Sequence, residues 1–294
     1  MDALIRGYAK AQNIELVYVD ATESARELER RHLAGPAAGK ALAEALVATA
    51  MLSSDAANEG ECLLLQMRVD GPLGGVVAEA AHNGALRGYT FRKKLDDFDT
   101  LEDMDLAKAW GETGLLAVTL SVPGRLIYSG QVSATPPNPQ RNLARYYNES
   151  KQLPAGVEIL AVSGGGQVKQ AVGLAALKMA GCSTEDFVAA LELFQKGAVR
   201  KLLADATGLD DFRKLFGYDK LEILAYRELR FGCRCTREKC RDAVAALDDA
   251  DLRDIAAKGQ PQDVTCHFCG ETWRVSADEV RRMLEQRGGA RRGA

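Results

Sequence analysis

The sequence lacks several features that mark common classes of protein. It contains only three histidines, which disfavours a metal site built mainly on imidazole. No uninterrupted apolar stretch approaches the roughly 18 residues that a membrane-spanning helix needs. The N-terminal segment MDALIRGYAKAQ has no apolar core of signal-peptide length. We therefore expect a cytoplasmic protein with no membrane partner.

An excess of basic charge is also missing. The formal net charge is −3 and the sequence pI is near 5.8, whereas nucleic-acid binders usually carry a basic face. No nucleic-acid partner is expected for this reason. Hydrophobic residues make up 47% and charged residues 27%, which are ordinary values for a globular protein. At 294 residues the chain predicts a large core with a small appended module.

No phosphate-binding motif accompanies the glycine run SGGGQ at 163–167, because neither Gly-Lys-Ser/Thr nor a spaced G-x-G-x-x-G follows it. We interpret this run as a turn. The acidic stretch DDFDTLEDMD at 96–105 is interpreted as a solvated loop or short helix rather than a cation site. We assign no catalytic residue and expect that the protein is not an enzyme.

The first half of the chain predicts a mixed fold. Residues 24–52 predict two helices broken at Gly35-Pro36. From Glu61 onward, short apolar runs alternate with glycine-containing turns, which is typical of antiparallel strands. The runs are ECLLLQMRV, GGVVAEAA, ALRGYT, GLLAVTLSV and RLIYSGQVS.

Two further elements complete the expected core. Asn138 before Pro139 predicts the N-cap and first residue of a helix. The run VEILAVS that follows this helix predicts another strand. The expected fold class is α+β, with a large core domain of antiparallel sheet and helices over 1–181.

A segment of short amphipathic helices follows the core. Ser183 begins a capping box, and residues 183–217 are divided by Gly197 and Gly208. Each helix is near or below the ~12 to 15 residues at which an isolated helix is marginal in water, so the helices need a docking partner. We predict a metastable helical linker at 182–231. Its apolar candidates for an exposed surface are Phe187, Leu191, Phe194, Phe212, Leu215 and Phe216.

Five of the seven cysteines fall within 37 residues, at Cys233, Cys235, Cys240, Cys266 and Cys269. Short-spaced pairs on two separate segments are typical of tetrahedral zinc, because two thiolates fill half the coordination sphere from one turn. The glycine of CHFCG allows positive φ where the chain turns its amides toward the sulfurs. We predict a small four-cysteine module at 232–294 that holds one zinc ion on Cys233, Cys235, Cys266 and Cys269. Ligand pairs that use Cys240 remain an alternative.

Other readings of these residues are less favoured. A static disulfide framework does not persist in the cytoplasm, and a thioredoxin-like pair needs a βαβ context that is absent. His267 is expected to point away from the metal, while His32 and His82 are expected at the surface or in turns. Cys62 lies in an apolar run and is expected to be buried and inert. Cys182 precedes a helix, and we assign it no role.

The free energies involved indicate what oxidation of such a site would do. Structural zinc contributes an apparent ~10 to 16 kcal/mol to the folding of a small module, whereas net stabilities are only ~5 to 15 kcal/mol. If an oxidant takes the thiolates, the nearest partners lie within each pair, and such small loops return only roughly 1.5 to 2 kcal/mol each. Oxidation is therefore predicted to unfold the module and to expose the apolar residues of the upstream helices.

The same residues carry a family resemblance. The segment RFGCRCTREKC, the interval from Cys235 to Cys266 and the segment VTCHFCGETWRVSADEV together resemble the bacterial redox-regulated holdase chaperone family, the heat-shock protein of thirty-three kilodaltons. The core segments LLLQMRVDGPLGGVVAEA, GALRGYT and YYNESKQLP are similar to that family as well. Lys151 departs from the family's S-E-Q run, and the stretch around 92–105 matches weakly. Neither departure involves the cysteines.

The resemblance implies a redox switch. In the reduced form, a zinc-bound monomer is inactive. In the oxidised form, zinc is released, Cys233 is joined to Cys235 and Cys266 to Cys269, the linker is unfolded and the protein is a homodimer. That form binds unfolding client proteins without ATP under oxidative stress.

Two rival functions belong to other classes. A zinc-ribbon module that binds nucleic acid or a protein partner through the tail RRMLEQRGGARRG predicts salt-sensitive binding in the reduced state, and the acidic chain argues against it. A thiol oxidoreductase predicts turnover and a low-pKa thiolate in a C-x-x-C pair without zinc.

Overall fold

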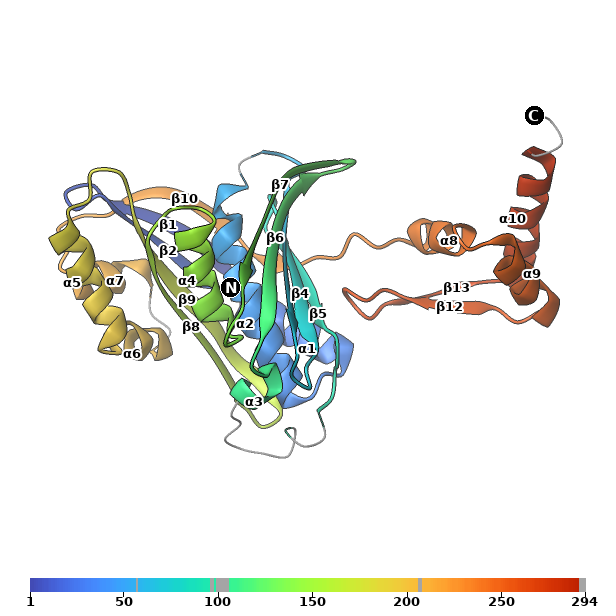
Figure 1. Cartoon of the computed structure of the whole chain (residues 1–294), viewed down its shortest axis with the longest axis horizontal. Helices are drawn as coiled ribbons and strands as arrows, with labels where there is room; N and C mark the ends of the chain where they lie inside the picture. Colours follow the sequence, from blue (N-terminus) through green and yellow to red (C-terminus); the bar gives the residue numbers. More distant parts are fainter. Residues whose placement is uncertain (57, 96–97, 99–105, 206–207, 291–294) are drawn as a thin grey trace. The chain divides into compact units, whose positions relative to one another are not determined.

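The computed structural model describes every residue except 57, 96–97, 99–105, 206–207 and 291–294 (Figure 1). Apart from Phe98, the acidic stretch at 96–105 lies outside the described residues. The chain divides into two compact units, Met1–Gly232 and Cys233–Ala294.

The first sheet has five strands in the order β10-β1-β2-β9-β8, and all neighbours are antiparallel. Its strands are β1 (Ala3–Ala9), β2 (Ile14–Asp20), β8 (Ala155–Gly164), β9 (Gln167–Lys178) and β10 (Glu222–Glu228). The strand predicted at VEILAVS is β8. The predicted turn at SGGGQ joins β8 to β9, with Gly165 and Gly166 at positive φ.

The second sheet has six strands in the order β11-β5-β4-β3-β6-β7. They are β3 (Cys62–Val69), β4 (Gly75–Ala81), β5 (Ala85–Thr90), β6 (Gly114–Val122), β7 (Arg125–Ser133) and β11 (Arg230–Phe231). The five antiparallel strands expected from the apolar runs are β3 to β7, so that prediction is confirmed. β11 pairs in parallel with β5.

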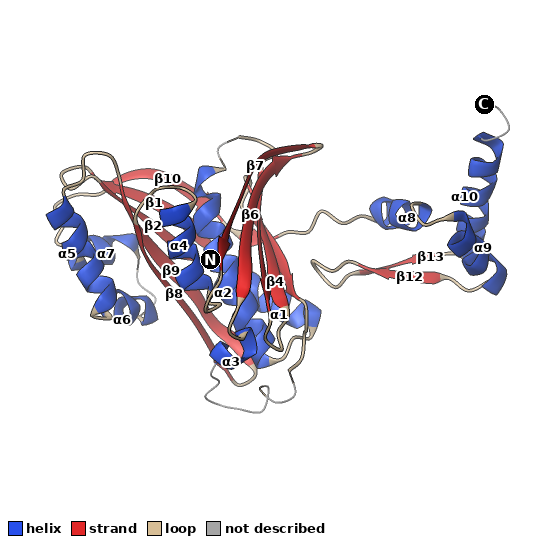
Figure 2. Ribbon diagram, in the orientation of Figure 1, coloured by secondary structure: helices blue, strands red, loops and turns tan. Residues whose placement is uncertain are grey.

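Helices pack between and beside the two sheets, as Figure 2 shows. They are α1 (Thr22–His32), α2 (Pro36–Leu52), the 3-10 turn η1 (Ser53–Asp55), α3 (Leu106–Trp110) and α4 (Pro139–Glu149). α2 contacts strands of both sheets, and its many alanines suit this close approach. The predicted break at Gly35-Pro36 is confirmed, and so is the cap at Asn138, whose side chain accepts the N–H of Arg141 at 2.9 Å.

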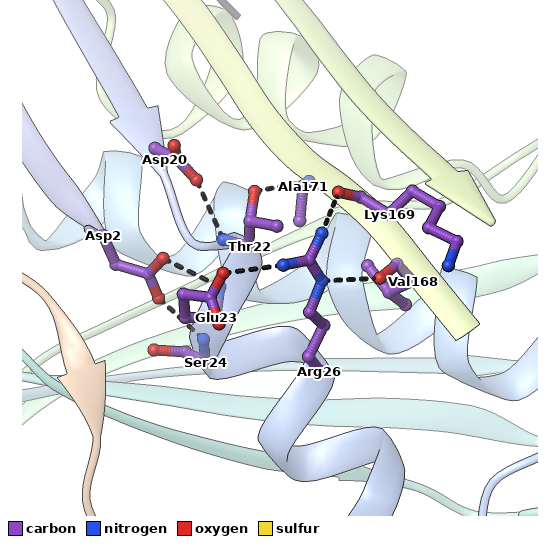
Figure 3. Close-up of polar contacts among 9 residues, drawn as sticks. All are labelled: Asp2, Asp20, Thr22, Glu23, Ser24, Arg26, Val168, Lys169 and Ala171. Atoms are coloured by element: carbon purple, nitrogen blue, oxygen red, sulfur yellow. Dashed lines mark hydrogen bonds and ion pairs between the residues drawn. The ribbon is translucent and has the colours of Figure 1, made fainter. Parts of the chain in front are cut away.

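The N-terminal end of α1 is fixed by residues that are distant in sequence (Figure 3). The carboxylate of Asp2 accepts the backbone N–H groups of Glu23 at 2.8 Å and Ser24 at 2.7 Å. Burial raises the pKa of Asp2 above its ordinary value, and these hydrogen bonds pull it back. Arg26 then donates to the carbonyl of Val168 at 2.9 Å, which ties α1 to β9.

The predicted helical segment folds as α5 (Thr184–Gln195), α6 (Ala198–Ala204) and α7 (Leu209–Leu215). Ser183 caps α5 by accepting the N–H of Asp186 at 3.0 Å. The three helices cover the face of the first sheet that α2 does not contact (Figure 1). The docking partner that these short helices need is therefore the first sheet.

The last part of the expected linker is extended rather than helical. β10 pairs with β1 at one edge of the first sheet, and β11 pairs with β5 of the second sheet. Leu229 between them is buried, and the ring of Phe231 lies 4.6 Å from the guanidinium of Arg31. The chain is thus anchored to both sheets directly before Cys233.

The second unit has a small core of its own. Its elements are α8 (Arg237–Ala245), α9 (Asp249–Lys258), β12 (Gln262–Thr265), β13 (Thr272–Val275) and α10 (Ala277–Ala290). The buried apolar residues are Val244, Leu252, Val275, Val280 and Met283. The α+β class, with antiparallel sheets, helices and a small C-terminal cysteine module, is confirmed.

Candidate metal centre

The segment CHFCG forms the turn between β12 and β13. The carbonyl of Cys266 accepts the N–H of Gly270 at 2.8 Å, and the N–H of Cys266 donates to the carbonyl of Glu271 at 2.8 Å. Gly270 has φ of 73°, a conformation that suits glycine, as the sequence predicted. This turn presents Cys266 and Cys269 on the same side of the hairpin end.

The other pair lies in the extended segment between β11 and α8. Thr236 caps α8 by accepting the N–H of Lys239 at 3.2 Å, and Lys239 Nζ donates to the carbonyl of Arg234 at 2.8 Å. These contacts fix the short segment in which Cys233 and Cys235 alternate with Arg234. The C-x-C spacing therefore presents two sulfurs from one extended stretch.

The four sulfurs converge. The Sγ atoms of Cys233, Cys235, Cys266 and Cys269 all lie within 4.8 Å of one another. The distance is 3.8 Å from Cys233 to Cys266 and 3.4 Å from Cys235 to Cys269. Zinc–sulfur bonds of about 2.3 Å in a tetrahedron separate the sulfurs by about 3.8 Å. The donor set and its dimensions therefore fit a metal ion of the zinc class.

The electrostatics of the four cysteines also favour a bound cation. Burial raises the pKa of the Cys269 thiol well above its usual range, and the neighbouring sulfurs raise it further. Burial also raises the pKa of Cys235. Four thiolates at such distances repel one another, so the ionised set requires a cation at its centre. An all-sulfur tetrahedron selects soft or borderline metals such as zinc.

The remaining cysteines lie outside this group. Cys240 is buried on α8 and is not among the four converging sulfurs. Cys62 is buried in β3, as expected. Cys182 is partly buried, and burial raises the pKa of its thiol, which disfavours a reactive thiolate there.

The histidines take no part in the cluster, but one expectation about them is wrong. His267 is exposed, and His82 is partly buried with Nδ1 2.9 Å from the carbonyl of Ala56. His32, expected at the surface or in a turn, is only 5% exposed, and its Nε2 lies 2.9 Å from the carbonyl of Gly88 in β5. The packing of the last turn of α1 against the second sheet accounts for this burial.

The apolar candidates of the helical segment are found together in one cluster. Phe187 and Phe212 are buried, and the other four are partly buried against the same cluster. The sheet residues of that cluster come from β1, β2, β8 and β9. They are Ala9, Ile14, Leu16, Tyr18, Leu160, Val172, Leu174 and Ala176. The helices thus hide two complementary apolar surfaces, their own and that of the sheet.

A capping box at the start of α10 in the second unit was not predicted from the sequence. Glu279 Oε2 accepts the N–H of Ser276 at 3.0 Å, Ser276 caps α10, and Arg237 of α8 donates to Glu279 at 2.8 Å. The Ser276 and Arg237 contacts lower the pKa of Glu279 to about 2. The signal was present, because Ser276-x-x-Glu279 is a capping-box sequence.

No helix among the described residues is long and apolar enough to cross a membrane. A family model described as Hsp33 protein matches residues 2–276. The 33 kDa chaperonin of Symbiobacterium thermophilum is 31% identical over 292 residues, which cover 98% of each chain. The 33 kDa chaperonin of Thermus thermophilus is 31% identical over 307 residues, covering 97% of this chain and 87% of that protein.

A solved structure agrees in fold. The crystal structure of the 33 kDa chaperonin (heat shock protein 33 homolog) of Thermotoga maritima matches with a TM-score of 0.85 at 24% identity, covering 98% of this chain and 99% of that one. The resemblance recognised in the cysteine and core segments is thereby confirmed. The chain belongs to the Hsp33 family and is a chaperone, not an enzyme.

Proposed function

We propose that this chaperone is a redox-regulated, ATP-independent holdase of the cytoplasm that binds unfolding proteins under oxidative stress. The observation that carries the proposal is the convergence of four thiols in a unit whose own apolar core has only a few buried side chains. Such a unit depends on its thiols for stability. The proposed division remains a core at 1–181, a metastable linker at 182–231 and a switch module at 232–294.

In the reduced state, Cys233, Cys235, Cys266 and Cys269 are the proposed ligands of one zinc ion, which when bound would neutralise and hold the four thiolates. The chain contributes the turn that holds Cys266 and Cys269, the fixed extended segment that holds Cys233 and Cys235, and the ion pair between Arg237 and Glu279. In this state the apolar cluster between α5–α7 and the first sheet is covered, so it is not available to clients and the protein is inactive.

In the oxidised state, Cys233 is joined to Cys235 and Cys266 to Cys269. Each disulfide forms as two thiols lose two protons and two electrons to an oxidant such as peroxide, which becomes water. The thiolates are then no longer available to a metal. The two small loops return only roughly 1.5 to 2 kcal/mol each, so the module loses more stability than it regains.

The loss of stability in the module then affects the preceding segments of the chain. Gly232 donates its N–H to the carbonyl of Leu86 at 3.0 Å, and the next residue is the first cysteine of the cluster. β11 has only two residues, so its pairing with β5 is a weak anchor. When the module unfolds, this anchor frays, and the short helices α5–α7 follow.

The proposed client surface consists of the two apolar faces that separate. One carries the six candidates of the helices, and the other is the outer face of the first sheet. Exposed apolar areas of this kind bind unfolding chains or a second copy of the protein. The oxidised form is accordingly proposed to be a homodimer.

The test is to oxidise purified reduced protein with peroxide or hypochlorite, count the zinc released and follow the light scattering of an unfolding test protein. Suppression of scattering is expected only after zinc release. Equal suppression by reduced protein, or none after zinc loss, contradicts the proposal. A Cys266→Ser, Cys269→Ser variant should bind zinc weakly and need no oxidant, whereas Cys182→Ser, which removes none of the four converging sulfurs, should keep the zinc affinity of the wild type.

A further inference from the structure

The sheet face that α5–α7 cover contains a buried acid. Glu158 lies on β8 with its side chain only 8% exposed. It is two residues from Leu160 and opposite Leu174 of β9, so it shares the face of the apolar cluster. A surface that bound clients through apolar contacts alone has no need of a carboxylate in this position.

The chain's own helix α6 supplies the cation for this acid. Arg200 Nη1 donates to Glu158 Oε1 at 2.8 Å. Arg200 lies between Val199 and Leu203, which are both buried in the cluster.

A second donor to Glu158 remains when α6 departs. Gln140 of α4 donates from Nε2 to Glu158 Oε2 at 3.4 Å, a long hydrogen bond from a neutral donor. The short, charged contact therefore comes from the segment that undocks, and the weak one from the segment that stays. Water then takes the place of Arg200 on Glu158.

A client that covers this face removes that water. A purely apolar client segment buries the Glu158 carboxylate without a cation, which costs free energy. A segment with a lysine or arginine among its apolar residues restores the ion pair and avoids that cost. The acid therefore selects clients by penalising those that leave it unpaired.

We propose that the outer face of the first sheet prefers client segments in which a basic residue is flanked by apolar residues, with that residue in the place of Arg200 on Glu158. Helix α6 is then an internal occupant of the client site. Its run Val199-Arg200-Lys201-Leu202-Leu203 displays the preferred pattern. This inference rests on the proposed function, because the face is accessible only after α5–α7 undock.

The test uses fluorescein-labelled peptides of residues 184–205 with Arg200 retained, with Arg200→Gln or with Arg200→Glu. Their binding to the full-length protein, reduced and oxidised, is measured by fluorescence anisotropy. The arginine peptide should bind oxidised protein about tenfold more tightly than the glutamine version, and the glutamate version should bind most weakly. A second host peptide of unrelated sequence but the same apolar and basic spacing should show the same order.

The variant Glu158→Gln should abolish this preference and leave the affinity for the glutamine peptide at least as high. Glu149→Gln on the exposed surface of α4 makes the same change in net charge and should leave the preference intact. If Glu158→Gln does not fold, the affinity ratio on wild-type protein still decides.

Equal binding of the three peptides to oxidised wild type overturns this inference and leaves the proposed function standing. A preference that survives in Glu158→Gln also overturns it, because it then arises from general charge. If no peptide distinguishes oxidised from reduced protein, the proposed function fails, and this inference fails with it.

Discussion

The Sγ atom of Cys235 lies 3.4 Å from the Sγ atom of Cys269, although 34 positions separate them in the chain. Cys233 and Cys266 approach to 3.8 Å in the same way. The folded cluster thus brings sulfurs together across the two segments, and two kinds of disulfide are within reach. Crossed bonds, which join Cys233 to Cys266 and Cys235 to Cys269, would each close a long loop. Each would contribute roughly 4 kcal/mol of stability and would hold the module together.

The first prediction is that oxidation joins Cys233 to Cys235 and Cys266 to Cys269, because only bonds within each pair leave the module free to unfold. Proteolysis without reduction, followed by mass spectrometry, maps the bonds. Crossed bonds in the active species would mean that the module stays folded and that the proposed switch is wrong.

The second prediction concerns the docking of the linker helices. Phe212 is fully buried against Tyr18 of the sheet, with ring centroids 5.9 Å apart. Phe212→Ala removes a contact of about 3 to 5 kcal/mol and should undock α7 in reduced protein. Binding of a hydrophobic dye and suppression of aggregation, both without oxidant, are the measurements.

Val188 provides the matched control for that change. It lies on α5 with 47% of its surface exposed, so Val188→Ala should alter neither dye binding nor activity. A reduced Phe212→Ala protein that binds the dye but does not suppress aggregation would show that undocking does not activate the chaperone.

The third prediction is a pH dependence of stability. Burial raises the pKa of Glu44 from 4.5 to about 7, while Lys40 and Arg200 pull it back, and its Oε2 is buried without a hydrogen-bond partner among the described residues. A raised folded-state pKa means that this group's contribution is fully present below pH 4.5 and is lost as the pH rises to about 7.

Glu44→Gln removes this loss. The variant should be more stable than wild type at pH 8 by about 1 to 2 kcal/mol, and nearly equal to it at pH 5. The full shift corresponds to about 3 kcal/mol, but the rest of the side chain is partly exposed, which reduces the effect. Urea unfolding at both pH values measures the difference, and an unchanged difference would refute the assignment.

The fourth prediction concerns the start of α1. Asp2→Ala leaves two backbone N–H groups of the first turn without their acceptor and should cost about 1 to 2 kcal/mol of unfolding free energy. Urea unfolding followed by the fluorescence of Trp110, which is buried in the first unit, reports the change. Wild-type stability in the variant would show that Asp2 is dispensable as a cap.

Local signals predicted much of the fold. The strands β3 to β7, the break at Gly35-Pro36 and the caps at Asn138 and Ser183 were found because each depends on residues close together in sequence. The four converging cysteines were found for the same reason, since pair spacing restricts their geometry. Cys240 could be separated from them only once its position on α8 was known.

Other features depend on contacts that spacing does not encode. The linker helices were predicted, but their partner was not, because an apolar stripe does not say which surface covers it. β10 and β11 pair with β1 and β5, which precede them by more than 130 positions in the chain. The burial of His32 likewise follows from packing against β5 rather than from its neighbours in sequence.

We propose above all that oxidation of the cysteine module undocks α5–α7 from a sheet that itself stays folded. Hydrogen exchange of the reduced and oxidised protein, resolved by segment, tests it most directly. Residues 184–204 and 208–216 should lose their protection on oxidation, while β8 and β9 keep theirs. Unchanged protection of these residues in an oxidised, zinc-free and active protein would contradict this proposal.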